Sequence, residues 1–150
     1  MSASSEPFPI VLIGLHTEMG ALVSRSLLPE YEVIRFIQSF EEAQADLPHL
    51  LAGREPPTPS TNDVGTHEYG RPARAVLFGR AFTPEQAAAL KKSAAGSAKD
   101  AVVWVAGDPA GKPSGDGPPP GYEEVVAKTA KSIIGRWREE GAVRDETVLY

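Results

Sequence analysis

The chain has 150 residues, of which 41% are apolar and 23% are charged, and its net charge at pH 7 is −5. This length suits one domain whose core needs no metal or disulfide. The acidic balance argues against a nucleic-acid surface, which needs clustered Lys and Arg. The lack of cysteine excludes disulfides, thiolate catalysis and cysteine-ligated metal.

Location and metal binding are constrained by what the sequence lacks. The three histidines do not have metal-ligand spacing, so we expect no metal site. No apolar stretch approaches the roughly 20 residues of a membrane span. The first residues lack the basic region and apolar core of a signal peptide. We therefore expect a cytoplasmic protein that does not bind membranes, with residues 1–8 as a flexible arm.

Three unbroken apolar runs, each followed by a glycine, predict strands that are buried on both faces. They are Ile10–Ile13 before Gly14, Ala75–Phe78 before Gly79, and Ala101–Ala106 before Gly107. Tyr31–Ile37 has a mixed pattern, which suits an edge strand with partial solvent access.

Helical patterns separate these strands. After the turn that ends at Gly20, Ala21 to Leu28 continues a helical pattern whose core stripe begins at Met19, and Pro29 ends this first helix. Ser39 and Glu42 form a capping box that starts a second helix, which Pro48 kinks or ends before Gly53. Thr83, Pro84 and Gln86 start a third, which runs to about Ala95, and the last helix covers residues 122 to 140. Both tryptophans, Trp104 and Trp137, are expected in the core.

Two long segments are rich in Pro, Gly and small polar residues. Residues 53–72 are either a disordered excursion or a lid or partner-binding loop, with His67 and Tyr69 as its anchors. Residues 108–121 leave directly from the carboxyl end of a buried strand, which makes them the better candidate for a lid.

Strands alternating with helices predict one α/β domain over residues 1–150, a doubly wound three-layer sandwich of the flavodoxin or Rossmann type. Right-handed crossovers give a parallel sheet of four or five strands in the order 2-1-3-4. The fourth strand, Ala101–Gly107, would then be an apolar edge, which is an aggregation hazard. Either Thr147–Tyr150 pairs with it as a fifth strand, or a second subunit covers it in a homodimer.

The turn from Gly14 to Gly20 stands where Rossmann domains bind a dinucleotide. These two residues match the outer glycines of that turn, so the stretch resembles short-chain dehydrogenases and NmrA-like proteins. The resemblance covers about the first 40 residues and implies NAD or NADP as cofactor. Glu18 departs from the pattern, since it stands where that turn has its middle glycine. A carboxylate at this position repels phosphate. Gln38 and Ser39 stand where the acid that binds ribose is expected, and no Tyr-x-x-x-Lys pair is present.

Two further families share the expected winding. Residues 74–90 have the layout strand, short turn and helix opening on Thr83, which is similar to the substrate domain of D-2-hydroxyacid dehydrogenases. That resemblance implies a flavodoxin-like fold, but the catalytic Arg, Glu and His of the family are missing. Receiver domains of two-component signalling need acids after the first strand and an Asp ending the third. Leu15 and His16 stand in the first of those places, and Gly79 and Arg80 stand in the second.

One cluster of polar residues follows the three glycines. His16 and Arg80 could hold a small anion near the first helix, and Asp108 could orient or charge the imidazole. The alternative is a salt bridge between Arg80 and Asp108 at the rim of the sheet, with His16 as a turn residue. The ligand-binding candidates are Gly14, His16, Thr17, Gly20, Gly79, Arg80, Gly107 and Asp108.

The sequence contains no complete catalytic motif. It predicts a ligand- or partner-binding module without self-contained catalytic machinery, and leaves the catalytic residues unknown. The alternative is an NAD(P)-linked oxidoreductase or accessory enzyme whose site is completed by a dimer or partner.

Overall fold

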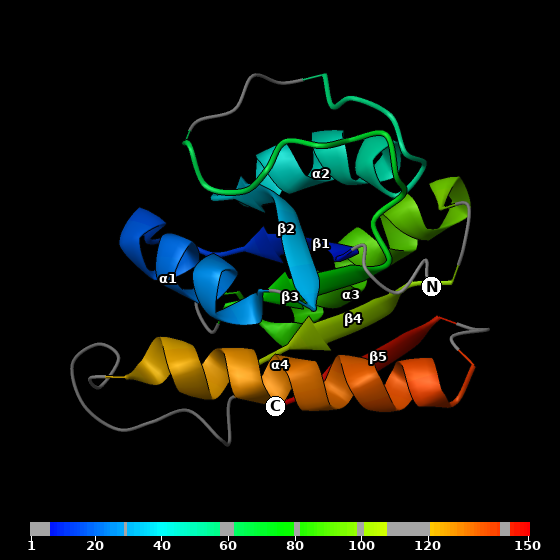
Figure 1. Cartoon of the computed structure of the whole chain (residues 1–150). Coiled ribbons are helices and arrows are strands. Elements are labelled where there is room, and N and C mark those ends of the chain that lie inside the picture. The colour runs from blue at the N-terminus through cyan, green and yellow to red at the C-terminus, as the bar shows by residue number, and fades with distance from the viewer. Residues whose placement is uncertain are drawn as a thin grey trace.

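The computed structural model describes residues 7–28, 30–57, 62–79, 82–98, 101–107, 121–141 and 145–150. Strands and helices alternate along these ranges (Figure 1). The strands are β1 (Phe8–Ile13), β2 (Tyr31–Ile37), β3 (Ala75–Phe78), β4 (Val103–Ala106) and β5 (Glu146–Leu149). The helices are α1 (Thr17–Leu27), α2 (Phe40–Leu50), α3 (Pro84–Ala94) and α4 (Tyr122–Glu139), and a 3₁₀ turn, Ala95–Ser97, follows α3.

The strands form one parallel sheet in the order β2-β1-β3-β4-β5. This confirms the predicted α/β fold, in which a parallel sheet lies between two helical layers. The C-terminal segment is the fifth strand and pairs with β4. The amide of Glu146 donates to the carbonyl of Val102 at 3.2 Å, and the amide of Tyr150 donates to the carbonyl of Ala106 at 3.0 Å.

The pairing of β5 changes the expectation for assembly. β4 has β3 on one side and β5 on the other. The alternative in which a second subunit pairs with Ala101–Gly107 therefore has no free edge to use. The apolar edge that the sequence leaves open is covered within the chain.

Each face of the sheet carries two helices (Figure 1). α1 and α4 cover one face and α2 and α3 the other, and side chains from successive strand positions alternate between the two cores. Leu12 and Leu77 pack toward α1 and α4, whereas Ile13 and Phe78 pack toward α2 and α3. Trp104 and Trp137 are both buried, as predicted.

The last crossover departs from the right-handed winding that we expected. The units β3–α3–β4 and β4–α4–β5 step across the sheet in the same direction, but α3 and α4 lie on opposite faces. The two crossovers therefore have opposite hands, although such connections almost always share the right-handed form. The first two crossovers share the hand of β3–α3–β4. The exception places α4 beside α1.

Residues 62–69, called the strap below, run along the outer edge of β2. The amides of Thr66 and His67 donate to the carbonyls of Val33 and Ile34, both at 2.9 Å. All of β2 is buried, although it is the edge strand and was expected to be partly exposed. The strap therefore packs on the edge of the sheet and is not the loose excursion that the composition of residues 53–72 suggested.

Gly65 allows the strap to lie this close to β2. Its φ is 95°, in the left-handed region that favours glycine. A Cβ at this position would lie 2.9 Å from the carbonyl oxygen of Val33, which is too close. His67 also has a positive φ, of 60°. The backbone of the strap is thus shaped around the strand that it covers.

The side-chain caps predicted at the start of two helices are confirmed. The Ser39 hydroxyl accepts from the amide of Glu42 at 3.1 Å, and the Thr83 hydroxyl accepts from the amide of Gln86, also at 3.1 Å. Pro48 lies inside α2, which continues to Leu50 and ends before Gly53, as predicted.

The ends of some elements differ from the sequence estimates. Phe8 was placed in a flexible arm, but it begins β1, and its amide donates to the carbonyl of Glu30 at 2.9 Å. The third helix ends at Ala94 and passes into a 3₁₀ turn. Most of the segment predicted at 108–121 lies outside the described residues, and Gly121 precedes α4.

Candidate functional site

Two of the predicted glycines meet where the sheet changes its winding direction. β1 leads to a helix on one face and β3 to a helix on the other, and this is the topological position at which open α/β sheets bind ligands. The amide of Gly79 donates to the carbonyl of Ile13 at 2.7 Å. A Cβ on Gly79 would lie 3.6 Å from the Cα of Gly14. Gly14 and Gly79 are therefore neighbours at the carboxyl ends of β1 and β3.

The structure places only part of the predicted polar cluster. His16 is exposed at the start of α1, where its side chain does not cap the helix. Gly107 is buried after β4. Arg80 and Asp108 lie outside the described residues, so the grouping of His16 with these two stays a prediction.

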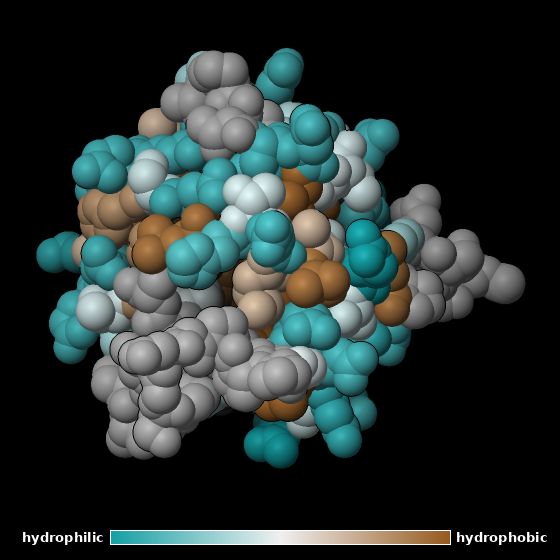
Figure 2. Space-filling view, turned by 90° about the vertical axis from the view of Figure 1, so that its left-hand side faces the viewer, coloured by the Kyte–Doolittle hydropathy of each residue, from teal (hydrophilic) through white to brown (hydrophobic). Residues whose placement is uncertain are grey.

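Apolar side chains reach the surface on the side where the strands end. This side lies to the left in Figure 1, and Figure 2 shows brown apolar surface on it between teal polar residues. Leu15 in the turn after β1 is 52% exposed, and Val125 near the start of α4 is 59% exposed. The described part of this side therefore offers apolar contact area beside its polar groups.

Packing against Phe36 accounts for the two glycines of the expected nucleotide turn. A Cβ on Gly20 would lie 2.6 Å from the Phe36 ring, and one on Gly14 would lie 3.3 Å from it. Phe36 is itself buried in β2. The glycines let α1 and the turn before it approach this ring, which is a structural reason for glycine that does not require a ligand.

Gln38 fills the place that an acid takes in a ribose-binding Rossmann domain. Its Nε2 donates to the carbonyl of Leu15 at 3.0 Å and to the hydroxyl of Thr17 at 2.9 Å. Its Oε1 accepts from the side-chain amide of Asn62 at 3.2 Å. Gln38 thus ties the turn after β1 to the strap. The sequence shows the missing acid but not this connection.

An open groove of about 640 Å³ lies between α1 and the strap. Val33 of β2 lines it, and so do strap residues 62–66. α1 contributes side chains at three- and four-residue spacing, which is one face of a helix. They are Thr17, Ala21, Ser24 and Arg25, to which Leu28 just after the helix is added, and Thr17 was predicted as a site residue.

Several polar side chains of the groove hold its walls in place. The Asn62 side-chain amide donates to the carbonyl of Phe36 at 2.9 Å, and its oxygen accepts from the amide of Val64 at 3.0 Å. The Thr66 hydroxyl donates to the carboxylate of Glu32. These groups fix the strap to β2 and are therefore committed to structure.

Three other polar side chains of the groove are not committed in this way. Ser24 and Arg25 from α1, and Asp63 from the strap, make no side-chain hydrogen bond or ion pair with the rest of the described chain. Beside apolar lining from Ala21 and Val64, the groove thus has one cation, one anion and one hydroxyl that make no side-chain bond within the described residues. This combination suits an organic ligand with polar groups.

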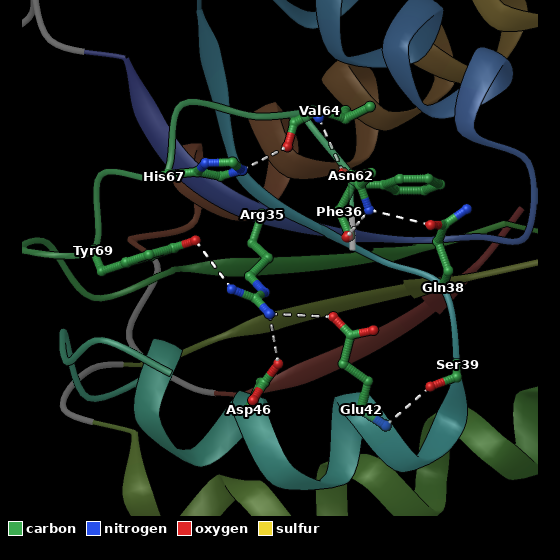
Figure 3. A network of polar contacts seen from close by, with 10 residues as sticks. All are labelled: Arg35, Phe36, Gln38, Ser39, Glu42, Asp46, Asn62, Val64, His67 and Tyr69. Carbon is green, nitrogen blue, oxygen red and sulfur yellow. Dashed lines mark hydrogen bonds and ion pairs between the residues drawn. The ribbon is translucent and has the colours of Figure 1, made fainter. Parts of the chain in front are cut away.

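A buried ionic network holds the other side of the strap (Figure 3). The Nη2 of Arg35 lies 3.3 Å from Glu42 Oε2 and 3.2 Å from Asp46 Oδ2. Its Nη1 donates to the Tyr69 hydroxyl at 3.2 Å. The side chains of Arg35 and Asp46 are 3% and 0% exposed. The network therefore fastens the strap and α2 to β2 from within the core.

The environment of Glu42 disfavours its charged form. Burial raises the pKa of this carboxyl above its ordinary value, the hydrogen bond from Arg35 opposes the shift, and the charge of Asp46 adds to it. Sequence reasoning missed this network. The available signal was an arginine inside an apolar strand, followed by carboxylates one helical turn apart at positions 42 and 46.

Two negative findings apply to the described ranges alone. They contain no group of three or more His, Asp or Glu side chains that could hold a metal ion. None of their helices is both long enough and apolar enough to cross a membrane.

Comparison with known proteins gives one informative likeness. The chain is similar to "Kojic acid related protein 6" of Aspergillus oryzae (strain ATCC 42149 / RIB 40), with 27% identity over 139 residues. The aligned part is 92% of this chain and 83% of that protein. No family model matches the chain, and no solved structure matches it.

Proposed function

We propose that this protein is a binding module that takes a small organic ligand in the groove between α1 and the strap. One observation carries the proposal: the groove has apolar lining and three polar side chains, Ser24, Arg25 and Asp63, that make no side-chain hydrogen bond or ion pair within the described residues. Its volume of about 640 Å³ falls within the range of roughly 300–1,000 Å³ that is usual for small-molecule sites. A cytoplasmic location is part of the proposal.

The chemistry of the groove favours binding over catalysis. Its described lining has no histidine, lysine or tyrosine, and it does not pair a nucleophile with a base. Arg25 supplies a fixed positive charge for an anionic group, and Asp63 accepts hydrogen bonds. These groups can orient a ligand in the groove, which is the role that the proposal gives them.

Kojic acid is the first compound to test. The similar protein from A. oryzae carries its name, and the compound is a small hydroxylated pyranone with ring surface and hydrogen-bonding oxygens. An anilinonaphthalene sulfonate dye is a second probe, because it joins apolar rings to an anionic group.

The experiment compares two tryptophan substitutions. Ser24→Trp places a large side chain in the groove, whereas Ser132→Trp places the same side chain at an exposed position of α4 outside the groove. We expect dye fluorescence and a kojic-acid thermal shift in the wild type and in Ser132→Trp, and their loss in Ser24→Trp. Equal responses of all three proteins to both probes, or no response of the wild type to either, would contradict the proposal.

An NAD(P)-linked oxidoreductase or accessory enzyme is the second candidate. Its support is the contact between Gly14 and Gly79 at the crevice where Rossmann-like sheets bind ligands. It predicts a thermal shift with NAD or NADP that His16→Ala or Arg80→Ala weakens and Ser24→Trp leaves unchanged. Gln38 binds the Leu15 carbonyl and the Thr17 hydroxyl, in the turn that a dinucleotide would have to approach, and this favours the first candidate.

A further inference from the structure

The two ends of the groove can be told apart from the contacts of its walls. At one end, Gln38 joins Thr17 of α1 to Asn62 of the strap. At the other end, the amide of Thr66 donates to the carbonyl of Val33. Val33 precedes Phe36 by three residues in β2, and Asn62 donates to the carbonyl of Phe36. α1 runs antiparallel to β2, as a crossover helix does. The groove therefore extends along β2.

The uncommitted charges lie toward opposite ends of this groove. Asp63 follows Asn62 at the end where α1 begins, and Arg25 lies eight positions after Thr17 along α1. At a rise of about 1.5 Å per residue, eight positions of helix span roughly 12 Å. Arg25 and Asp63 do not form an ion pair with each other. The groove is therefore positively charged toward one end and negatively charged toward the other.

The surface between these charges suits an extended ligand. Ala21 from α1 and Val64 from the strap supply apolar lining, and Ser24 supplies a hydroxyl that can donate or accept. The dipole of α1 has the opposite polarity, because its positive N-terminal end lies toward Asp63 and its negative C-terminal end lies toward Arg25. The partial charges of this dipole amount to about half an elementary charge at each end. The full charges of Arg25 and Asp63 outweigh them.

We infer that the groove takes a short extended peptide of about three residues, with its free carboxylate at Arg25 and its free amino group at Asp63. Three extended residues span roughly 10 Å, which is comparable to the roughly 12 Å that α1 covers between Thr17 and Arg25. This inference rests on the proposed binding function and adds the chemical class of the ligand. Recognition of both chain ends would make the groove selective for length as well as charge.

The test is a titration followed by ¹H–¹⁵N NMR, which detects weak binding. The probes are trialanine, N-acetyl-trialanine, trialanine amide and dialanine. We expect trialanine to shift the amides of Ser24, Val64 and Gly65. Blocking either end or removing one residue should weaken binding by about three- to tenfold, the range for a charge contact at a partly exposed site.

Variants assign each end of the peptide to one residue. Asp63→Asn should weaken trialanine but not N-acetyl-trialanine, and Arg25→Gln should weaken trialanine but not its amide. The matched controls are Glu139→Gln and Arg136→Gln, which change exposed residues of α4 outside the groove and should have no effect. Equal affinities for free and blocked peptides would overturn the inference.

The outcomes separate this inference from the proposed function. Binding of kojic acid or the dye that Ser24→Trp abolishes, without any response to trialanine, would overturn the peptide assignment and leave the binding function standing. If Ser24→Trp changes the binding of no probe, peptides included, both are overturned. Trialanine binding that requires Arg25 and Asp63 in the expected pairing supports both.

Discussion

The two sides of the strap use polar residues in opposite ways. On the side of α2, Tyr69 joins the buried network of Arg35, Glu42 and Asp46. On the side of α1, the charge of Asp63 is exposed beside an open groove. Burial makes the first set obligatory, since an unpaired buried charge is very costly. Exposure leaves the second available for a ligand.

This difference gives a criterion for separating structural from functional polar residues. A polar side chain that hydrogen-bonds to other parts of the chain, as Asn62 does, has a structural role that accounts for its presence. A side chain such as Arg25 lines the groove without a partner in the described chain and has no such explanation. The criterion predicts contrasting effects of substitution on the two sides.

The largest expected effect comes from removing Arg35. Arg35→Met leaves two carboxylates buried without their cation, so we expect a loss of about 3–5 kcal/mol in the free energy of unfolding. Arg25→Met removes the same side chain from the groove side and should change stability by less than about 0.5 kcal/mol. Urea unfolding of both variants measures the contrast. Similar losses would show that Arg25 also serves the fold.

The second prediction concerns the side of α1 that faces the core. A Cβ at position 20 would overlap the Phe36 ring at 2.6 Å, so Gly20→Ala should cost about 1–3 kcal/mol. Gly135→Ala is the matched control, because the nearest atom to its Cβ is the Tyr31 hydroxyl oxygen at 3.9 Å. Helix propensity predicts that this control gains about 0.5–1 kcal/mol. Thermal unfolding should therefore move the two variants in opposite directions, and a stable Gly20→Ala would contradict the packing explanation.

The third prediction compares neighbours on the strap. Asn62→Ala removes the hydrogen bonds to the Phe36 carbonyl and the Val64 amide, and should cost about 1–2 kcal/mol. Asp63→Ala should cost less than about 0.5 kcal/mol, since its side chain bonds to nothing in the described chain. Hydrogen exchange of the Thr66 and His67 amides reports the release of the strap directly. Equal exchange in both variants would remove the distinction between these residues.

The smallest effect is a pH dependence from Glu42. Burial raises its folded pKa above the unfolded value near 4.5, so the folded state binds this proton more tightly. The stability that the carboxyl contributes is present below the unfolded pKa and is lost as the pH rises through the folded pKa. Unfolding free energies of the wild type and Glu42→Gln should therefore diverge in favour of Gln as the pH rises above about 4.5. A difference that moves the other way would mean that Arg35 dominates.

Much of the fold follows from local patterns in the sequence. The apolar runs before Gly14 and Gly79 predict strands, because these strands are buried on both faces of the sheet. Ser39 and Thr83 predict helix starts, because each hydroxyl accepts a hydrogen bond from the backbone amide three residues later. Such signals depend on neighbours in the chain, so they can be read without a structure. The cover of β4 by the C-terminal strand was one of two alternatives that the sequence left open.

The parts that could not be predicted depend on contacts between distant segments. Phe36 explains Gly20 only once β2 and α1 are packed, and Asn62 contacts Gln38 across 24 positions. Composition made the strap look unstructured, because backbone bonds to β2 leave no pattern in its own residues. The hand of the last crossover likewise has no local signal. The rim was predicted, whereas the groove beside it was found only through these distant contacts.

The most direct test of the central claim is a map of the amides that respond to ligand. Titration of the wild type with kojic acid, the dye and trialanine should shift resonances of Ser24, Arg25 and residues 63–65, and leave those of Tyr69 and Gly79 in place. That result would place binding on the uncommitted side of the strap. Shifts centred on Gly14, His16 and Gly79, with none at residues 63–65, would contradict it and move the site to the rim of the sheet.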